Sequence, residues 1–591
     1  MPSFENIRLF AWLTLAYLLW MNFEAWQTDH APSPAAMATT VATTAGASSA
    51  TAGPVPNNFA SAVPAAPAAP PAVVPTPGVA TAAAAALPTT SGVAVPGATD
   101  GAVAAVAAAP VLVHITTDVL DLTVSTRGGD LVQLDLPAYP EKKATPEEKV
   151  RLFDSSNPMT RYLHQGGLTT GAAAQGRAEP NHLAVYTAAR TQYTLNEGAA
   201  ELRVPLTWTD GAGLTVMRTY VFHRGRYAVE VETSVQNAGA EAVTVAPYSQ
   251  LLRRAAPVKS SMFNPETYAY RGPAVYDGEK YQKLTVTDSD AQKFQQQIKG
   301  GWFAAMQHYF VTAIVPPENE AWNYTLHIDG DDALLQTTGP AHTVAPGTTT
   351  DLHQTLYMGP KLQDQLALAG PRLELTVDYG KLTLIAKPLF WVLQQVHALV
   401  SNWGVAIILV TLLIKLVFYK LAETSGRSMA RMRNIAPRMK VLQERYKDNR
   451  EELGKQMMEL YKREKVNPIA GCLPMLVQIP FFIAFYWVLM ESVDMRQAPF
   501  IGWLNDLSSK DPYFILPAIM GVAMFAQFKL NPAPPDPVQA KVFAFMPVVM
   551  AVTMAWFPSG LVLYWITNTG LSILQQWHIN KIVAQEGASK P

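Results

Sequence analysis

One lysine stands inside an otherwise apolar stretch of the chain. Residues 403–421 read as a membrane helix, with Lys415 twelve residues after Trp403. A Lys near the centre of such a helix costs about 2.5–3.5 kcal/mol to insert. If Trp403 marks one interface, Lys415 lies ~18 Å deeper. About 12 Å of a ~30 Å core then remains, roughly twice the reach of the side chain. A hydrated cavity is therefore the favoured interpretation, and snorkelling to the interface is the alternative.

Other polar side chains lie in neighbouring apolar stretches. Thr411 comes one turn before Lys415 and shares its helix face. The remaining polar positions are Gln478, near the start of its stretch, and Asn568, Ser572, Gln575 and Gln576, at near-helical spacing in the last one. Polar residues within membrane helices usually face the bundle interior or water. We expect a polar groove open to the cytoplasm; ordinary hydrogen bonding between helices is the alternative.

The opposite halves of these stretches are apolar and aromatic. The aromatic and apolar positions are Phe481, Phe482, Phe485, Tyr486, Trp487, Trp556, Phe557 and the run from Leu561 to Trp565. Such side chains would close the groove toward the outside, although aromatic belts at membrane interfaces are common.

A charged stretch with methionines at helical spacing follows the lysine. Residues 420–465 hold 13 Lys and Arg against 7 Asp and Glu. The apolar positions are Met429, Met432, Met439, Leu442, Leu453, Met457, Leu460 and Tyr461, with a plausible turn at Asp448-Asn449. The pattern predicts a helical hairpin. Its methionines, which adapt to varied apolar partners, could bind an apolar substrate or pack against each other.

Six apolar segments must position these residues. They are 7–23, 403–421, 473–490, 513–528, 542–556 and 560–577, most of them close to the ~20 residues that a bilayer demands. The basic excess of residues 420–465 places that loop in the cytoplasm. Six spans then place both termini in the cytoplasm, and Arg8 ahead of the first span agrees. A cleaved signal peptide is the alternative for residues 7–23.

Two non-membrane regions lie between the first and second spans. Residues 31–110 are rich in Ala, Pro, Thr, Gly and Val with almost no charge, which predicts a disordered tether. From Val111 the strand period appears, as in residues 113–116, 120–124, 220–235, 309–315, 322–328 and 352–358. Many strands separated by Gly, Asn and Asp turns predict a large antiparallel sandwich outside the cytoplasm. Residues 382–400, with Pro388, are predicted to lie in the membrane interface.

Composition limits the classes of function. The 591 residues carry a net charge of −1, so global charge implies no nucleic-acid partner. Cys472 is the single cysteine, which excludes an intrachain disulfide and a Cys-rich metal site. Neither a P-loop nor an HExxH motif is present, so we expect no enzyme, metal or cofactor. The sequence leaves a solute transporter, a protease using Ser559 and a purely structural assembly factor as rival functions, but it shows no clear repeat and no evident His or Asp partner for Ser559 within the spans.

Several ordered motifs occur across nearly the whole chain, the tether excepted. In the helical part these motifs are Asn402-Trp403-Gly404, Glu464-Lys465-Val466-Asn467-Pro468, Gly471-Cys472-Leu473-Pro474, Gln478-Ile479-Pro480, Arg496-Gln497-Ala498-Pro499-Phe500, Asp511-Pro512-Tyr513 and Phe557-Pro558-Ser559-Gly560-Leu561. In the strand-rich part they are Thr126-Arg127-Gly128-Gly129-Asp130 and Gly300-Gly301-Trp302-Phe303. The first set resembles the YidC family of membrane protein insertases, and the second set resembles the periplasmic domain of that family.

The resemblance implies a β-supersandwich in the periplasm and five core helices around a hydrophilic groove. The family's groove cation is usually Arg, and Lys415 stands at that position, which keeps the charge but loses the planar fork. The family's contacts with the client helix correspond to Ile479, Phe482 and Thr553 in this chain. The position of Thr553 is aromatic in relatives. We predict Trp565 as a further contact with the client helix.

The resemblance also implies partners and a location. They are nascent membrane proteins, the SecYEG and SecDF translocon, the ribosome and signal-recognition pathway, and membrane lipids, in the inner membrane of a Gram-negative bacterium. The tail after Trp577 is short, with Lys581 and Lys590, which argues against ribosome binding through a basic tail.

These inferences combine into one expected domain plan. It comprises an N-terminal anchor (1–24), a tether (25–110), the periplasmic domain (111–378), an interfacial helix (379–401), an insertase core (402–578) that includes the cytoplasmic hairpin (422–470), and a short cytoplasmic tail (579–591).

Overall fold

The computed structural model describes most of the chain from Pro110 onward. The described residues are 61–64, 110–172, 177–254, 269–286, 291–446, 449–464, 473–530 and 537–588. The predicted first span (7–23), the N-terminal anchor and nearly all of the predicted tether lie outside them, and so does Asp448 of the predicted hairpin turn.

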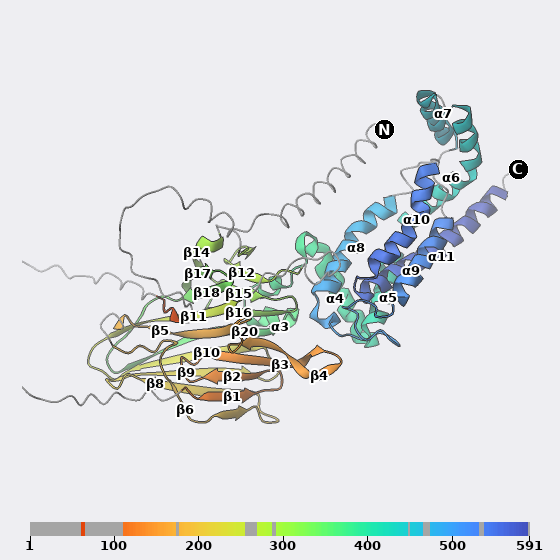
Figure 1. The fold of residues 1–591 in the computed structure, drawn as a ribbon. Coiled ribbons are helices and arrows are strands. Elements are labelled where there is room, and N and C mark those ends of the chain that lie inside the picture. Colours follow the sequence, from red (N-terminus) through yellow and green to blue (C-terminus); the bar gives the residue numbers. More distant parts are fainter. Residues whose placement is uncertain are drawn as a thin grey trace, which may run out of the picture. The chain divides into compact units, whose positions relative to one another are not determined.

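Strands fold the region after Pro110 into two large sheets (Figure 1). The first sheet has the order β14-β17-β18-β11-β5-β4-β3-β2-β1-β7, with β19 paired to β11. Its strands are β1 (Leu112–Thr116), β2 (Asp121–Ser125), β3 (Leu131–Lys142), β4 (Thr145–Asp154), β5 (Tyr162–Thr169), β7 (Gln192–Thr194), β11 (Val243–Arg254), β14 (Gln295–Lys299), β17 (Ala321–Asp329), β18 (Asp332–Thr338) and β19 (His342–Val344).

The second sheet has the order β13-β12-β15-β16-β20-β10-β9-β8-β6. Its strands are β6 (Thr187–Ala188), β8 (Glu201–Thr209), β9 (Leu214–His223), β10 (Ala228–Asn237), β12 (Gly272–Tyr276), β13 (Tyr281–Lys283), β15 (Trp302–Met306), β16 (Phe310–Val315) and β20 (Thr348–Pro360). The paired strands run antiparallel except for β1 and β7, which are parallel.

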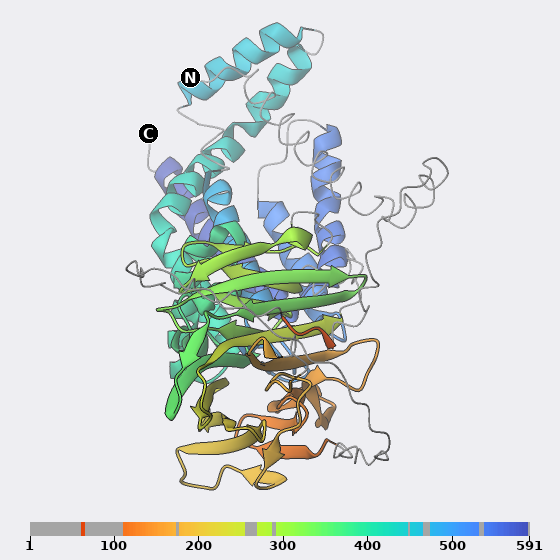
Figure 2. The same ribbon diagram turned by 90° about the vertical axis from the view of Figure 1, so that its left-hand side faces the viewer.

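The period-two pattern explains why these segments form strands. In β1 the side chains of Val113 and Ile115 are fully buried, while those of their neighbours point to solvent. At the turn between β2 and β3, Gly128 and Gly129 both adopt positive φ, a conformation that costs glycine little. Buried residues of both sheets form one core, so the predicted strand-rich region exists and packs face to face (Figure 2).

Helices follow the last strand and carry the predicted groove residues. Their bounds are α3 (Gln363–Ala369), α4 (Thr383–Val400), α5 (Trp403–Val417), α6 (Tyr419–Arg445), α7 (Arg450–Arg463), α8 (Leu473–Glu491), α9 (Ile515–Leu530), α10 (Pro537–Met554) and α11 (Ser559–Ala588). Short 3₁₀ turns lie at Ala291–Lys293, Leu373–Thr376, Gly380–Leu382 and Val493–Met495. Helix α11 packs against α5, α6, α8 and α9, and α4 packs against α5 and α8.

The segment around Lys415 differs from the prediction in its length. Helix α5 ends at Val417 and not at residue 421, because Phe418 leaves the helical conformation and the chain bends by 69° into α6. Among the described residues, no single helix meets a length and hydropathy test for crossing a membrane. The bent pair Trp403–Val417 and Tyr419–Met432 meets it jointly.

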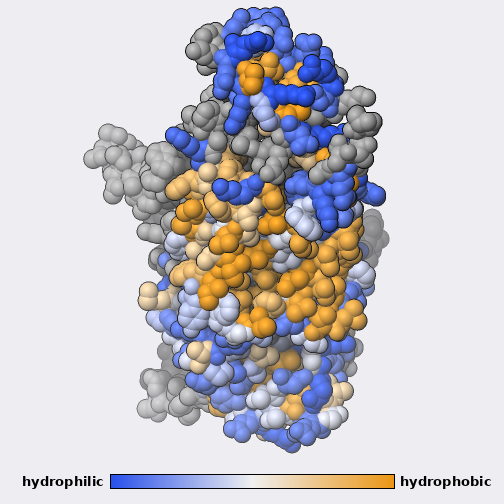
Figure 3. All heavy atoms as spheres, turned by 90° about the vertical axis from the view of Figure 1, so that its right-hand side faces the viewer, coloured by the Kyte–Doolittle hydropathy of each residue, from blue (hydrophilic) through white to orange (hydrophobic). Residues whose placement is uncertain are grey.

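A broad apolar area covers the middle of one face of the molecule (Figure 3). Large exposed apolar side chains occur on α5, α9 and α10, among them Leu416, Val417, Val522, Phe545 and Val552. On α4, Leu384, Trp391 and Leu399 are exposed, while the opposite face is buried against the bundle. Contiguous exposed apolar surface of this kind marks contact with a partner or with lipid.

Candidate functional site: a polar network between three helices

Helix α11 brings three predicted groove residues onto one face. Asn568, Ser572 and Gln575 follow each other at spacings of four and three residues, which places them one above the other along the helix. Each side chain is half-buried. The predicted set therefore has a continuous polar stripe on the last helix, facing its neighbours α5 and α8.

Hydrogen bonds connect this stripe to the two neighbouring helices. Lys415 Nζ on α5 donates to Ser572 Oγ at 2.8 Å, and Ser572 Oγ lies 2.8 Å from the Asn568 carbonyl, to which it donates. Gln478 Nε2 on α8 donates to Asn568 Oδ1 at 2.5 Å. Lys415, Ser572, Asn568 and Gln478 thus form one network across α5, α11 and α8, which we call the groove network.

The cation of the groove network is Lys415, and among the described residues no ion pair within 4.0 Å includes it. Its neighbours on α5, Leu412 and Leu416, are exposed apolar residues. A cation held by one hydroxyl in such surroundings keeps most of its capacity to attract an anion.

Three other predicted groove residues contribute less. Thr411 is buried, and its hydroxyl donates to the Ile407 carbonyl at 2.6 Å within its own helix. Gln575 Nε2 reaches the Tyr419 carbonyl at 3.5 Å, a long contact, and Gln576 bonds to Asn580 at 2.9 Å. The structure therefore places these residues beside the groove network rather than within its chain of hydrogen bonds.

The predicted client-contact residues lie on three helices, α8, α10 and α11. Ile479 on α8 is 44% exposed, and Thr553 on α10 is exposed with its hydroxyl bonded to the Val549 carbonyl. Phe482 packs edge-to-face against Trp565 at 5.1 Å between ring centroids. Trp565 Nε1 is buried and has no hydrogen-bond partner among the described residues.

Aromatic rings pack above the groove network, where we expected a seal. Phe485 stacks on Tyr564 at 4.7 Å, and Phe482 stacks on the same ring at 6.0 Å. Leu561 and Val562 at the start of α11 are fully buried. Ser559, the residue considered for a nucleophile, is buried and donates its hydroxyl to the Asp506 carbonyl at 2.8 Å, so no general base contacts it there.

The methionine hairpin folds as two helices that pack on each other. Asn449 caps the start of α7 by accepting a hydrogen bond from Glu452 N at 3.1 Å. Met432, Met439 and Met457 join a small apolar cluster between α6 and α7 with Ile435, Leu442, Leu460 and Tyr461. Met429 is half-buried and lies outside that cluster. Internal packing, one of the two sequence-based interpretations, thus accounts for three of the four methionines.

A buried polar cluster in the sandwich was not predicted. Arg218 on β9 is 3% exposed, donates to the Gly128 carbonyl at 2.7 Å and lies 5.4 Å over the ring of Tyr186. Asp130 is also buried and accepts a hydrogen bond from Gln165 at 2.8 Å. Burial raises the pKa of Asp130 to about 8, against the opposing effects of Gln165 and Arg218. The turn motif around Gly128 and Gly129 was visible in the sequence, but its strand partner was not.

A buried ion pair joins the sandwich to the end of α8. Lys361 Nζ, just after β20, lies 3.7 Å from Glu491 Oε2, and both side chains are almost fully buried. His308 Nε2 lies 2.8 Å from the carbonyl oxygen of Met490. No periodicity in the sequence could have paired residues that are 130 positions apart.

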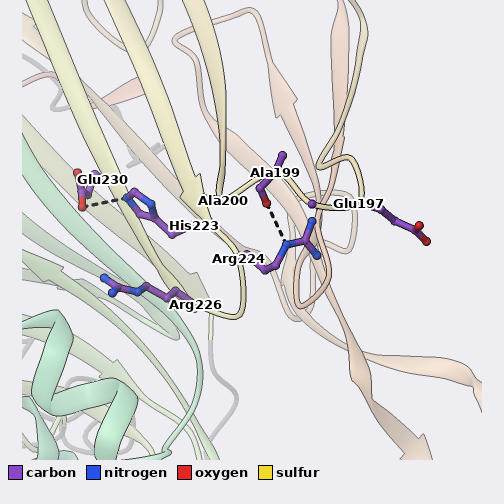
Figure 4. Close-up of a pocket in the computed structure, with 8 residues that line it drawn as sticks. Glu197, Ala199, Ala200, His223, Arg224, Arg226 and Glu230 are labelled. Atoms are coloured by element: carbon purple, nitrogen blue, oxygen red, sulfur yellow. Dashed lines mark hydrogen bonds and ion pairs between the residues drawn. The ribbon is translucent and has the colours of Figure 1, made fainter.

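The sandwich also carries an open hollow of about 760 Å³ (Figure 4). His223 and Glu230 pair there at 3.2 Å. Arg224 donates to the Ala199 carbonyl at 2.9 Å, and Arg226 also lines the hollow. Its two arginines are matched by Glu197 and Glu230, so its lining favours no ligand charge.

Comparison with known proteins places this architecture in a family. Residues 112–392 match the model of the YidC periplasmic domain, and residues 395–586 match the model of the 60Kd inner membrane protein. The chain belongs to the YidC family. The membrane protein insertase YidC of Nitrosococcus oceani is 42% identical over 99% of this chain and its own full length. That of Thioalkalivibrio sulfidiphilus is 47% identical over 80% of this chain and 86% of its own length.

These matches confirm the membership of the YidC family that the sequence motifs predicted. A solved structure of an active YidC insertase covers 79% of this chain and 94% of its own, with 16% identity and a TM-score of 0.34. Membership in the YidC family identifies the strand-rich region as a periplasmic domain and the helical region as part of an inner-membrane protein.

Proposed function

We propose that this chain inserts integral membrane proteins and assists their folding and assembly, with the groove network as the site that receives a client's polar tail. The observation that carries the proposal is Lys415: its described partner is a single hydroxyl, and no described carboxylate pairs with it. An acidic client tail supplies the missing anion. The network's amides and hydroxyl lower the cost of bringing polar backbone into the membrane.

The client's apolar segment then leaves along the surfaces of α8 and α10. Ile479 and Thr553 are exposed there, and Phe482 and Trp565 form the adjoining aromatic contact. Burial of the client's helix in lipid releases about 25 cal/mol per Å² of apolar surface. The membrane potential adds about 2.3 kcal/mol per charge moved across 100 mV. No nucleotide is needed for this cycle.

The proposal includes a topology. Six spans, counting residues 7–23, leave both termini in the cytoplasm and the sandwich, a β-supersandwich, in the periplasm of a Gram-negative bacterium. The basic excess on α6 and α7 supports a cytoplasmic hairpin, and the exposed apolar side chains of α9 and α10 support contact with lipid.

Partners follow from the same proposal. Nascent membrane proteins are the clients, delivered by ribosomes and the signal-recognition pathway, and the chain works alone or beside SecYEG and SecDF.

The deciding experiment uses the purified full-length protein in liposomes. Protease-protected insertion of a single-span client with an acidic tail is compared between wild type, Lys415→Ala and Lys415→Arg. We expect Lys415→Ala to insert about tenfold less, because a charge-assisted hydrogen bond contributes about 1.5–3 kcal/mol. Lys415→Arg should retain most activity, since it keeps the charge.

A matched control separates the groove charge from general basicity. Lys420, five residues further on, is almost fully exposed and pairs with Glu423 at 3.7 Å. Lys420→Ala should insert normally. Equal insertion by wild type and Lys415→Ala would refute the role of the groove cation, and a client with a neutral tail should show little difference among the variants.

A further inference from the structure

A second hollow, of about 330 Å³, lies where the sandwich meets the loop that follows α8. Its lining includes three arginines, Arg253, Arg271 and Arg496, and two carboxylates, Glu141 and Asp506. We call it the arginine pocket. Hydrogen bonds connect the sandwich to this loop beside the pocket. Arg496 donates to the Pro140 carbonyl at 2.8 Å, and Lys143 donates to the Asn505 carbonyl at 2.8 Å.

Two of the three arginines of this pocket lack an ion-pair partner within the described part of the chain, where no ion pair within 4.0 Å includes Arg253 or Arg271. Arg253 is largely buried, and its Nη1 donates to the Met306 carbonyl at 2.7 Å. Asp506 directs one carboxylate oxygen to neutral donors, Ser508 and the Gln497 amide.

The charge of the lining suits one anion. Among the described lining residues, three arginines minus two carboxylates leave a charge of +1. His308 also lines the pocket and adds no charge near neutral pH, because burial and the nearby cations Lys361, Arg271 and Arg496 lower its pKa to about 3. Burial and repulsion by Arg271 also lower the pKa of Arg253, so the two guanidiniums lie close enough to repel each other.

We propose that the arginine pocket binds a phosphodiester anion, and that its source is the headgroup of an anionic phospholipid. Guanidinium groups bind phosphate oxygens through paired hydrogen bonds. A volume of about 330 Å³ suits a headgroup rather than an extended peptide, because ligand pockets begin at roughly 300 Å³. Arg496 lies five residues after the end of α8, so the pocket adjoins the membrane surface.

This inference rests on the proposed topology, which makes that surface the outer leaflet. Its consequence is mechanical. A lipid headgroup seated between β3, β16 and the loop after α8 would hold the sandwich against the bundle beside Lys361 and Glu491. The anchoring lipid would then be a structural ligand and not a client.

Lipid binding by the full-length protein in neutral detergent tests the inference without requiring insertion. Native mass spectrometry would compare retention of phosphatidylglycerol and phosphatidylcholine by wild type, Arg271→Gln and Arg271→Lys. Arg271 is exposed and makes no described hydrogen bond, so its replacement should leave the fold intact. We expect Arg271→Gln to bind phosphatidylglycerol about tenfold more weakly, and Arg271→Lys to recover part of that loss.

The control is Arg226→Gln, in the charge-balanced hollow of the sandwich (Figure 4). It should bind like wild type. Equal binding by wild type and Arg271→Gln would overturn the proposal. Displacement of the lipid by glycerol phosphate at the same concentration would assign the pocket to a soluble phosphate ester, and preferential displacement by an acidic peptide would assign it to a protein segment; either result overturns the lipid. Arginine-dependent lipid binding would support it even where insertion fails in liposomes.

Discussion

The sandwich and the helical bundle each contain a buried or half-buried cation, but the partners that surround the two cations differ. Arg218 in the sandwich is 3% exposed, bonds to the Gly128 carbonyl, lies over the Tyr186 ring and has Asp130 near it. Lys415 in the bundle is half-buried, and its described partner is the Ser572 hydroxyl. A cation surrounded by partners stabilises a fold, whereas a cation with one weak partner remains able to bind an anion.

The largest effect should come from removing the cation of the sandwich. Arg218→Met should lower the stability of the sandwich by about 3–5 kcal/mol, because the buried Gly128 carbonyl loses its charged donor and the Tyr186 ring loses the cation that lies over it. Hydrogen exchange of β9 in the full-length protein measures the loss. The control is Arg203→Met on β8, which removes the exposed ion pair between Arg203 and Glu232 on β10. It should lower the stability by at most about 1 kcal/mol. Similar losses for both would show that Arg218 is not a structural cation.

The next effect concerns the ion pair between the two regions. Lys361→Met should destabilise the contact of the sandwich with α8 by about 3 kcal/mol, because it leaves Glu491 buried without its partner. The double variant Lys361→Met/Glu491→Leu should recover most of this loss, since replacing both charges removes the desolvation cost. Thermal unfolding of the single and double variants measures the loss of stability and its recovery. No recovery in the double variant would mean that the charges are needed beyond their mutual pairing.

A pH effect of about 2 kcal/mol should come from a histidine in the sandwich core. Burial and repulsion by Arg218 lower the pKa of His164 to about 3, and its Nε2 lies 2.7 Å from Ser249 Oγ. The unfolded chain takes up this proton below pH ~6.5, so stability is lost as the pH falls from there toward 3. Between pH 7 and 5 the loss is about 2 kcal/mol.

His164→Gln should remove that share of the acid sensitivity while keeping a polar partner for Ser249. Asp130 acts with the opposite sign, because its raised pKa makes stability fall as the pH rises from about 4 to 8. The informative quantity is therefore the difference between variant and wild type at each pH, measured by hydrogen exchange of β5. The control is His353→Gln, at an exposed position of β20. This variant should show the same dependence of stability on pH as wild type.

The smallest effect on stability should come from the cation of the bundle. Lys415→Met should change the unfolding free energy by less than about 1 kcal/mol, since one hydrogen bond to Ser572 is exchanged for apolar contact. Thermal unfolding in one detergent measures it. A loss as large as that expected for Arg218→Met would make Lys415 a structural cation and would remove the basis of the groove proposal.

Strands and helices were largely predictable, because local patterns produce them. The alternation at residues 113–116 became β1, and that at residues 309–315 became β16. The helical period located α7, whose cap at Asn449 coincides with the predicted turn. The helix end at Val417 was missed by four residues, since apolar composition continues past Phe418 while the backbone bends.

The groove residues were predictable in type but not in connection. A lysine and an amide inside apolar stretches are costly, so the sequence alone marks them as needing water or partners. That Lys415 bonds to Ser572 and Gln478 to Asn568 depends on how α5, α8 and α11 pack, and sequence separations of 157 and 90 residues carry no such information.

The sequence by itself determined the period of each segment, the apolar stretches, their basic flanks and the isolated lysine, because these are properties of neighbouring residues. The tertiary structure alone decided which cation is surrounded and which has one partner. Arg218 and Lys415 differ in that respect through carbonyls, rings and hydroxyls contributed by distant segments. Burial and electrostatic pairing arise only when those segments meet.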